Sequence, residues 1–454
     1  MDLKKISFSK EISLCDAYDV IVVGAGPAGC AAAAASAREG VRTLLVEASG
    51  MLGGMGTGGL VPSWSPFWDK EKIIYRGLAE KVLNETKKYS DHIMPQDLDW
   101  VPIDSEVLKR VYDKLVTENG ADILFHTQLC SVLTDENKKI TAVVLSNKKG
   151  LTAYSAKVFI DCTGDADLAA FAGAEFECGA DDGSFMPATL CFVIGNVDEY
   201  AYRFDNQSGL NYGTMQGTNP KSAIHKIVAD PKYPLVTDSH ICHQIIGPRT
   251  IGFNAGHIFN VDSTDPQSVS KAMIEGRELV YQIHEGLKEY FPTAFRSSIL
   301  IETAPMMGIR ESRRIVGDYK MTVEDYLQKR TFPDEISRNS YYIDLHLTIK
   351  EIEESEKKGI CREEINRRYK PGESHGIPYR SLLPKGIPNI IVAGRSISCD
   401  RQIQGSIRVM PNCLCTGEAA GIAAAMALNK NNNVHNIDVN ELRERLKSYG
   451  AYFL

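Results

Sequence analysis

The stretch Asp19–Glu47, DVIVVGAGPAGCAAAAASAREGVRTLLVE, decides the fold of this chain. It opens with a continuous apolar run, DVIVV, which is typical of a parallel strand buried on both faces. A glycine-rich turn follows, and then an alanine-rich run predicts a helix from about Pro27 to Arg38, packed close on the sheet and ended by Gly40. The second apolar run, VRTLLVE, completes a unit of strand, turn, helix and strand.

The glycines of the turn, Gly24, Gly26 and Gly29, fit the pattern G-x-G-x-x-G. One glycine makes the tight turn, one lets the backbone approach a pyrophosphate, and one lets the helix pack closely on the strand. The helix N-terminus presents free N–H groups and a positive dipole end to phosphates. Glu47 lies 47 − 24 = 23 positions after the first glycine, where a carboxylate accepts hydrogen bonds from a ribose diol. A solvated strand end is the alternative for Glu47, and the unit predicts a dinucleotide ligand, with NAD and FAD both open.

A second glycine cluster, MLGGMGTGGLVPSW, follows at residues 51–64. No alanine-rich run comes after it, so it does not open another helix of the same kind. Apolar residues alternate with the glycines, which disfavours a flexible surface loop. We expect a loop whose backbone lies against an extended ligand.

The rest of the chain predicts a discontinuous domain. An amphipathic helix is expected at 104–120, because Asp104 caps it and Gly120 stops it. Three strand-like runs, at 123–133, 140–147 and 153–162, predict an antiparallel meander that returns to the main sheet at Val158–Asp161. A strand, IPNIIVAGRSIS, and a small-residue helix, MPNCLCTGEAAGIAAAMAL, resume the first pattern near the C-terminus. We predict an α/β fold with a Rossmann-like domain, parallel sheet plus meander, at 16–175 and 371–454, and an inserted α+β domain at 176–370.

Composition limits the partners of this protein. Its formal net charge of −7 gives no general attraction to nucleic acid or to an anionic membrane. No run reaches the roughly 18 apolar residues that a membrane helix needs, and no signal peptide is expected. The eleven cysteines form no CxxC pair and no Cys/His array of zinc-site spacing, so no metal site is predicted. They suit reduced thiols in a cytoplasmic protein.

In chain order, these pieces resemble the bacterial FAD-dependent oxidoreductases of the glutathione-reductase-like superfamily, distantly similar to fumarate reductase flavoproteins and tRNA-modifying flavoproteins. The resemblance covers nearly the whole chain. The blocks that carry it are VGAGPAGCAAAAASAREG, LGGMGTGGLV, FIDCTGDADLAAFAGAEFE, PATLCFVIGNVD, GIRESRRIVGDY and IPYRSLLPKGIPNIIVAGRSIS with GSIRVMPNCLCTGEAAGIAAA.

The resemblance implies one FAD, extended across both parts of the discontinuous domain. It assigns the glycine turn to the pyrophosphate, Glu47 to the adenosine ribose, the backbone of Leu129 to the adenine, and a helix N-terminus near Asn412 to the pyrimidine side of the flavin ring. The cofactor-binding residues that it implies are Gly24, Ala25, Gly26, Pro27, Ala28, Gly29, Glu47, Gly53, Gly54, Leu129, Thr163, Gly164, Asp165, Gly394, Arg395, Gly405, Ser406, Met410 and Asn412.

Candidate substrate residues are fewer. Arg310 and Arg313, spaced i, i+3, fit one side of a helix turn, where guanidinium groups clamp a carboxylate. We expect one of them, with His375 and Arg408, to line a pocket shared by the two domains. Asp344 and His346 form a further polar pair. The alternative for these residues is a buried ion pair that fixes the domain interface.

The function predicted from the sequence is hydride transfer between FAD and a small organic substrate, for which a carboxylate is one option. A second G-x-G-x-x-G unit is missing, so no separate NAD(P)H domain is expected and the electron donor or acceptor is unknown. Two alternatives stay open: an RNA-modifying flavoprotein, which the overall acidity disfavours, and a flavin-binding subunit of a larger redox complex. A homo-oligomer is also open.

Overall fold

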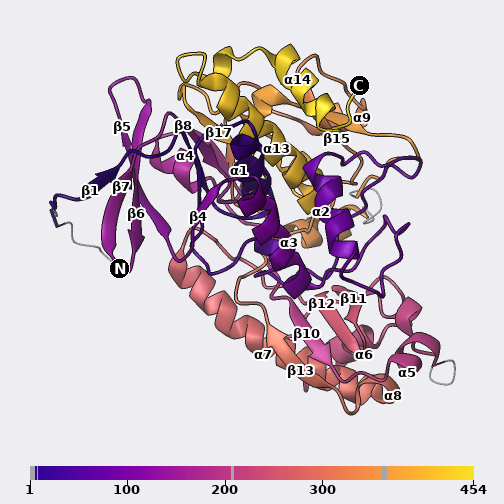
Figure 1. Ribbon diagram of the computed structural model, residues 1–454. Helices are drawn as coiled ribbons and strands as arrows, with labels where there is room; N and C mark the ends of the chain where they lie inside the picture. Colours follow the sequence, from indigo (N-terminus) through magenta and orange to yellow (C-terminus); the bar gives the residue numbers. More distant parts are fainter. Residues whose placement is uncertain (1–5, 8, 206–208, 360–365) are drawn as a thin grey trace.

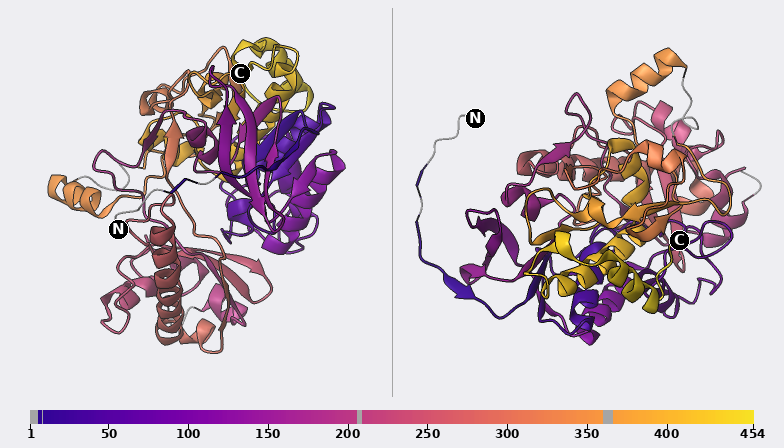
Figure 2. Two further views of the ribbon diagram at one scale, coloured as in Figure 1. Left: turned by 90° about the vertical axis from the view of Figure 1, so that its left-hand side faces the viewer. Right: turned by 90° about the horizontal axis from the view of Figure 1, so that it is seen from above.

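The computed structural model describes residues 6–7, 9–205, 209–359 and 366–454. An α/β body combines the N-terminal and C-terminal parts of the chain, and a second body, formed by its middle part, lies below it (Figures 1 and 2). The mixed α/β class with a Rossmann-like parallel sheet is as predicted.

A five-stranded parallel sheet lies at the centre of the α/β body. The strand order is β17-β8-β2-β3-β4, and each neighbouring pair is parallel. Strands from both ends of the chain meet in it, as predicted for a discontinuous sheet. Their bounds are β2 (Val20–Val23), β3 (Thr43–Val46), β4 (Asp122–Leu124), β8 (Val158–Asp161) and β17 (Ile390–Val392).

Both faces of this sheet are buried, which explains the continuous apolar runs. Val20 and Val22 pack in one hydrophobic core with the helices, whereas Ile21 and Val23 pack in another with the meander. Successive side chains of a strand point to opposite faces, so each face has its own cover. The helical cover comprises α1 (Pro27–Arg38), α2 (Leu78–Lys87), α3 (Ser105–Glu118), α13 (Met410–Ala427) and α14 (Val439–Ser448).

The helices α1 and α13 lie side by side (Figure 1). Their contact depends on glycine, because a Cβ at Gly417 would lie 2.1 Å from the carbonyl oxygen of Ala28. A Cβ at Gly421 would lie 2.3 Å from that of Ala32. The small residues that the sequence places in both helices therefore bring helix backbones from opposite ends of the chain into contact.

The meander differs from the prediction in two places. The run at 123–133 is divided between β4 of the parallel sheet and β5 (Gln128–Thr134), because His126 between them has a left-handed φ of 49°. The run at 153–162 is likewise divided between β7 (Gly150–Tyr154) and β8. Strands β5, β6 (Ile140–Asn147) and β7 are antiparallel neighbours, and β1 (Ser13–Cys15) adds a parallel edge.

The second body contains a four-stranded antiparallel sheet, order β11-β12-β10-β13, crossed by the long helix α7 (Figure 1). Its core is separate from the others and draws mainly on residues between Ala188 and Met307. The bounds are β10 (Phe192–Gly195), α5 (Glu199–Phe204), α6 (Ala223–Ala229), β11 (Ile241–Gly247), β12 (Thr250–Ala255), α7 (Pro266–Tyr290), α8 (Pro292–Phe295) and β13 (Ile299–Thr303).

The segment after the second body returns to the first. Core residues such as Met321, Ile336 and Leu345 belong to the cluster that contains α1 and α13. The elements here are α9 (Val323–Leu327), α10 (Ile349–Lys358) and the antiparallel pairs β9 (Phe176–Cys178) with β14 (Arg313–Ile315) and β15 (Glu335–Asn339) with β16 (His375–Pro378). The domain boundaries at 175 and 370 remain a prediction.

The structure bears on two expectations drawn from the composition, the lack of a membrane helix and the reduced state of the cysteines. Among the described residues, no helix has the length and apolar character that crossing a membrane requires. The described cysteines are all free, and the five in apolar or glycine-rich company (Cys30, Cys162, Cys191, Cys413 and Cys415) are buried.

Candidate cofactor and substrate site

The three glycines of the first turn have different surroundings. Gly24 has a φ of 90°, and a Cβ there would lie 2.6 Å from the carbonyl oxygen of Cys162. A Cβ at Gly29 would lie 1.8 Å from the carbonyl oxygen of Gly24. At Gly26, in contrast, a Cβ would meet nothing within 4 Å. The protein's own packing requires two of the glycines, and the third leaves a space beside the backbone that suits a ligand.

The space beside Gly26 lies at a helix N-terminus. Gly26 is the N-cap of α1, no side chain caps the helix, and Pro27 occupies its first turn. Ala28 follows in the same turn and is buried. Backbone N–H groups at such an end, together with the helix dipole, suit a phosphate.

Glu47 follows β3 and holds the turn in place. Its carboxylate accepts hydrogen bonds from the backbone N–H of Ala25 at 2.8 Å and from that of Ser49 at 2.8 Å. A carboxylate has about four acceptor positions, so two such bonds leave capacity for ribose hydroxyls. Glu47 is therefore more than a solvated strand end, because it fixes the loop that carries the glycines.

The second glycine cluster packs directly on the first. Gly53 donates its N–H to the carbonyl oxygen of Ala25 at 2.8 Å. A Cβ at Gly54 would lie 2.9 Å from the Cα of Gly26. The cluster is a turn with a short 3-10 helix at Gly54–Gly56, and its backbone borders the same space as the glycine turn.

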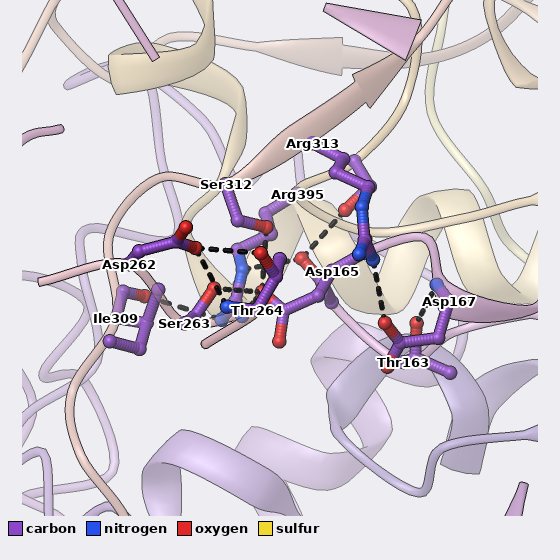
Figure 3. A network of polar contacts seen from close by, with 12 residues as sticks. Thr163, Asp165, Asp167, Asp262, Ser263, Thr264, Ile309, Ser312, Arg313 and Arg395 are labelled. Atoms are coloured by element: carbon purple, nitrogen blue, oxygen red, sulfur yellow. Dashed lines mark hydrogen bonds and ion pairs between the residues drawn. The ribbon is translucent and has the colours of Figure 1, made fainter. Parts of the chain in front are cut away.

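A polar network joins four segments next to this turn (Figure 3). The Arg395 guanidinium donates to the carbonyl oxygen of Gly164 at 2.6 Å, to Asp165 Oδ1 at 2.8 Å and to the carbonyl oxygen of Ile309 at 3.2 Å. Burial raises the pKa of the Asp165 carboxyl, but Arg395 and hydrogen-bonding serines outweigh it, so this pKa lies below its usual value. Thr163 starts the turn, with its N–H and hydroxyl donated to Asp161 Oδ1.

The C-terminal candidates lie around the start of α13. Gly394 has a φ of 93° and donates its N–H to Thr416 Oγ1 at 3.2 Å. Asn412 is buried and donates to the carbonyl oxygen of Ile407, while its Oδ1 is buried without a hydrogen-bond partner among the described residues. An orphaned buried acceptor beside a helix N-terminus fits a bound group that donates a hydrogen bond.

Three other cofactor candidates have protein partners. Ser406 lies in α12 (Arg401–Ile407), accepts a hydrogen bond from Asn339 Nδ2 and donates to the carbonyl oxygen of Tyr341. Gly405 packs on Asp344, whose carbonyl oxygen would lie 2.9 Å from an added Cβ. Leu129 lies in β5, opposite Leu145 of β6.

A cavity of about 840 Å³ lies between the two bodies. Met55, Arg395, Arg408, Val409 and Met410 line it from the α/β body. The walls from the second body and the returning segment include Thr189, Cys191, His240, Cys242, His243, Asn254, Arg310, Tyr341, Tyr342, Asp344 and His346. Arg395 and Met410 are thus the cofactor candidates that reach the cavity, together with Arg310 and Arg408 from the substrate candidates.

Arg310 is a buried cation that faces the cavity and, among the described residues, has no carboxylate within ion-pair distance. It donates to the carbonyl oxygen of Pro187 at 2.7 Å, to Thr189 Oγ1 at 2.8 Å and to Asn254 Oδ1 at 3.3 Å. Its acceptors in the described part of the chain are all neutral, and there it forms no ion pair. Burial, followed by the neighbouring Arg408, lowers its pKa to about 10, so Arg310 is still charged at neutral pH.

Arg408 enters the cavity as one member of an ion pair. It donates to Asp344 Oδ2 at 3.1 Å and to the carbonyl oxygen of Asp344 at 3.0 Å. Burial raises the pKa of Asp344, but the charges of His346, Arg408 and Arg310 hold it well below its usual value. Burial and Arg310 lower the pKa of His346, which lies 3.4 Å from Asp344 Oδ1, to about 3.

The other two substrate candidates lie elsewhere. Arg313 begins strand β14, so the expected helix turn with Arg310 is wrong; the chain is extended there because β14 pairs with β9. Its guanidinium bonds Asp167 Oδ1 at 2.7 Å and the carbonyl oxygen of Asp165 (Figure 3), which matches the alternative of a structural ion pair. His375 is fully buried in β16, where its Nδ1 lies 3.0 Å from the Tyr369 hydroxyl, and it does not line the cavity.

Sequence reasoning missed several polar residues of the cavity region. Thr189 and Asn254 hold Arg310, and Asp238 lies 3.0 Å from His257, which in turn contacts His346 at 2.9 Å. No local motif marks these residues. A buried arginine that needs neutral acceptors is visible only once the chain is folded.

Three curated proteins and a solved structure resemble this chain. A tRNA uridine 5-carboxymethylaminomethyl modification enzyme of Lachnoclostridium phytofermentans is 32% identical over 165 residues, covering 34% of this chain and 25% of that protein. A digeranylgeranylglycerophospholipid reductase of Picrophilus torridus is 29% identical, and the match covers 32% of this chain and 39% of that protein. A thiamine thiazole synthase of Aeropyrum pernix is 33% identical, covering 28% and 43%. The solved structure of a geranylgeranyl bacteriochlorophyll reductase-like protein of Thermoplasma acidophilum has a TM-score of 0.45 at 13% identity. The match covers 96% of this chain and 83% of that chain.

The curated matches cover less than half the length of each of these relatives. A family model is more extensive: one described as FAD dependent oxidoreductase matches residues 19–446, which include the glycine turn, the second body and α13. FAD is the cofactor of such an enzyme, and the space at Gly26, the uncapped N-terminus of α1 and the orphaned Asn412 oxygen fit it. The chain belongs to the FAD dependent oxidoreductase family.

Proposed function

We propose that this FAD-dependent oxidoreductase transfers a hydride between its flavin and a small organic substrate that carries a carboxylate, in the cavity between the two bodies. The single observation that carries the substrate class is Arg310. It is buried, charged, exposed to the cavity and bonded to neutral acceptors, and no carboxylate in the described part of the chain forms an ion pair with it. A buried charge is costly unless it is paired, and a ligand carboxylate supplies the pair.

The residues around Arg310 prepare it for this role. Pro187, Thr189 and Asn254 accept hydrogen bonds from the guanidinium and so fix its orientation. A planar, prepositioned fork binds a carboxylate with little loss of side-chain entropy. Arg408 is less available, because Asp344 already neutralises it.

On the cofactor side, the proposal assigns the pyrophosphate to Gly26 and the N-terminus of α1, the ribose to Glu47, and the flavin ring to the start of α13 with Met410 and Asn412. Bound FAD supplies the hydride donor or acceptor. The walls from the second body exclude water from the reacting carbon. A separate NAD(P)H domain is not part of this proposal, so the second electron partner is a diffusible molecule.

The test combines cofactor loading with anaerobic reduction. The full-length protein is saturated with FAD, and the loss of flavin absorbance is followed with a panel of hydroxy and amino acids and their amides. The proposal expects reduction by some of the carboxylates and at least tenfold slower reduction by the matched amides. Equal rates for acids and amides would refute the carboxylate class.

Arginine variants locate the contact. In Arg310→Ala the rate with the best acid should fall at least about tenfold, equivalent to ~1.4 kcal/mol of transition-state stabilisation, with an unchanged flavin spectrum. Arg310→Lys keeps the positive charge but loses the planar guanidinium, so its rate should lie between those of the wild type and Arg310→Ala. Arg42→Ala is the control, because Arg42 is an exposed partner of Asp19. A wild-type rate in Arg310→Ala would contradict the proposal.

A further inference from the structure

We infer that His240, His257 and His346 form a binding site for one divalent first-row transition-metal ion at the cavity wall. One nitrogen from each ring can serve as a ligand, and these three atoms lie within 4.8 Å of one another. The rings come from three separate segments of the chain. This inference goes beyond the proposed hydride transfer and does not depend on it.

The outer nitrogens of two rings are held by carboxylates. Asp238 Oδ2 lies 3.0 Å from His257 Nδ1, and Asp344 Oδ1 lies 3.4 Å from His346 Nε2. Both carboxylates lie on the outer side of the imidazole pair, where they can accept from its outer N–H groups. A carboxylate that accepts from the outer N–H of a histidine places the lone pair on its inner nitrogen, as in the carboxylate, histidine and metal arrangement of many metalloproteins.

The inner nitrogens then face each other. His257 Nε2 and His346 Nδ1 are 2.9 Å apart. A proton on one of these nitrogens makes a neutral N–H···N hydrogen bond between the rings, and without that proton a metal ion can join the two nitrogens. Two nitrogens bound at right angles to one ion, with bonds of about 2.0–2.1 Å, lie about 3 Å apart, which agrees with the observed separation.

The third ring and the access route are what favour a metal ion at this place. His346 is buried and lines the cavity. His240 brings a third imidazole, stacked on the His257 ring with 4.1 Å between centroids. A set of imidazoles without thiolates suits Zn²⁺, Fe²⁺, Ni²⁺ or Cu²⁺ rather than Mg²⁺ or Ca²⁺. His240 and His346 line the cavity, so the open positions of the ion are accessible from it.

Zinc binding tests the site directly. The FAD-loaded, full-length protein is stripped with a chelator, dialysed against micromolar Zn²⁺ and analysed for metal content. We expect one zinc ion per chain in the wild type, and at least tenfold weaker binding in His257→Gln and His346→Gln. His225→Gln is the control, because His225 lies on α6 and contacts the carbonyl oxygen of Asn219 instead. Retained flavin absorbance in every variant verifies the fold.

The readout separates this inference from the proposed function, because metal content does not depend on flavin reduction. X-ray absorption of the zinc-loaded protein should show nitrogen and oxygen neighbours that include imidazoles. A wild type that retains no more zinc than His346→Gln would overturn the inference and leave the N–H···N hydrogen bond. Sulfur neighbours would also overturn it, since they would place the ion at cysteines.

Discussion

At the scale of single residues, identical amino acids in one motif are needed for different physical reasons. Gly24 and Gly29 are surrounded by backbone, at 2.6 Å and 1.8 Å from an added Cβ, whereas Gly26 faces open space. A motif search treats the three positions alike. The structure separates those that the apoprotein needs from the one that its ligand needs.

This separation gives a prediction for two alanine variants. Gly26 has a φ of −68°, which alanine adopts without strain, so Gly26→Ala should leave the unfolding free energy of the apoprotein unchanged or raise it by about 0.4–1 kcal/mol. FAD affinity should fall at least about tenfold, ~1.4 kcal/mol, because the methyl group occupies the ligand's space. Gly29→Ala should instead destabilise the apoprotein by about 1–3 kcal/mol through overpacking. Urea unfolding without FAD and fluorescence titration with FAD distinguish the two, and tight FAD binding by Gly26→Ala would contradict the assignment.

At the scale of secondary structure, strand β16 buries His375, a residue expected to line the substrate pocket, at a place outside the cavity. The whole strand is buried and pairs with β15, which places His375 against the rings of Tyr326 and Tyr369 and away from the cavity. Its Nε2 is buried without a hydrogen-bond partner in the described part of the chain. His375 therefore acts on stability.

Burial, followed by the charge of Arg338, lowers the pKa of His375 to about 3. The unfolded chain, with a histidine pKa near 6.5, takes up the proton first, so the folded state is at full stability above about pH 6.5 and loses it as the pH falls. Between about pH 7.5 and 5.5 this residue should contribute a loss of ~1.4 kcal/mol. In His375→Gln the decrease in unfolding free energy between these two pH values, measured with urea, should be smaller than in the wild type by ~1.4 kcal/mol. Equal decreases in the two proteins would show that His375 does not titrate on unfolding.

At the scale of the whole molecule, the two bodies are joined by a polar network centred on Asp165 (Figure 3). Its Oδ1 accepts from Ser263 at 3.0 Å, Ser312 at 2.6 Å and Arg395 at 2.8 Å. Ser263 lies just before α7, while Arg395 follows β17 and reaches the cavity. The carboxylate therefore couples the second body to the cofactor side of the cavity.

Replacement of this carboxylate should weaken the contact between the two bodies. Asp165→Asn should lower the unfolding free energy by about 1.5–3 kcal/mol, the range for hydrogen bonds to a charged group, because a neutral amide cannot form an ion pair with Arg395. Since the pKa of Asp165 is lowered in the folded state, its stabilisation is present above about pH 3.8 and is lost below it. The difference between wild type and variant should thus be constant from about pH 5 to 8, as measured by urea unfolding. Ser268→Ala, next to the network but not bonded to Asp165, is the control, and an unchanged stability of Asp165→Asn would refute the role.

The sequence by itself determined the elements whose signals are local. The apolar run before Gly24, the small-residue helices and the caps at Asp104 and Gly120 depend on neighbours a few residues away, and the structure has them as predicted. The meander was less predictable, because the left-handed turn at His126 moves the chain from one sheet to another without a glycine or proline to mark it.

Only the tertiary structure decided which polar side chains share the cavity. Arg310 and Arg313 are three residues apart, yet one faces the cavity and the other pairs with Asp167, because the strand pairing of β14 begins between them. His240, His257 and His346 are separated by 17 and 89 residues, and no spacing rule relates them. Contacts of this kind depend on how two bodies pack against each other, which is a property of long-range burial and not of any local pattern.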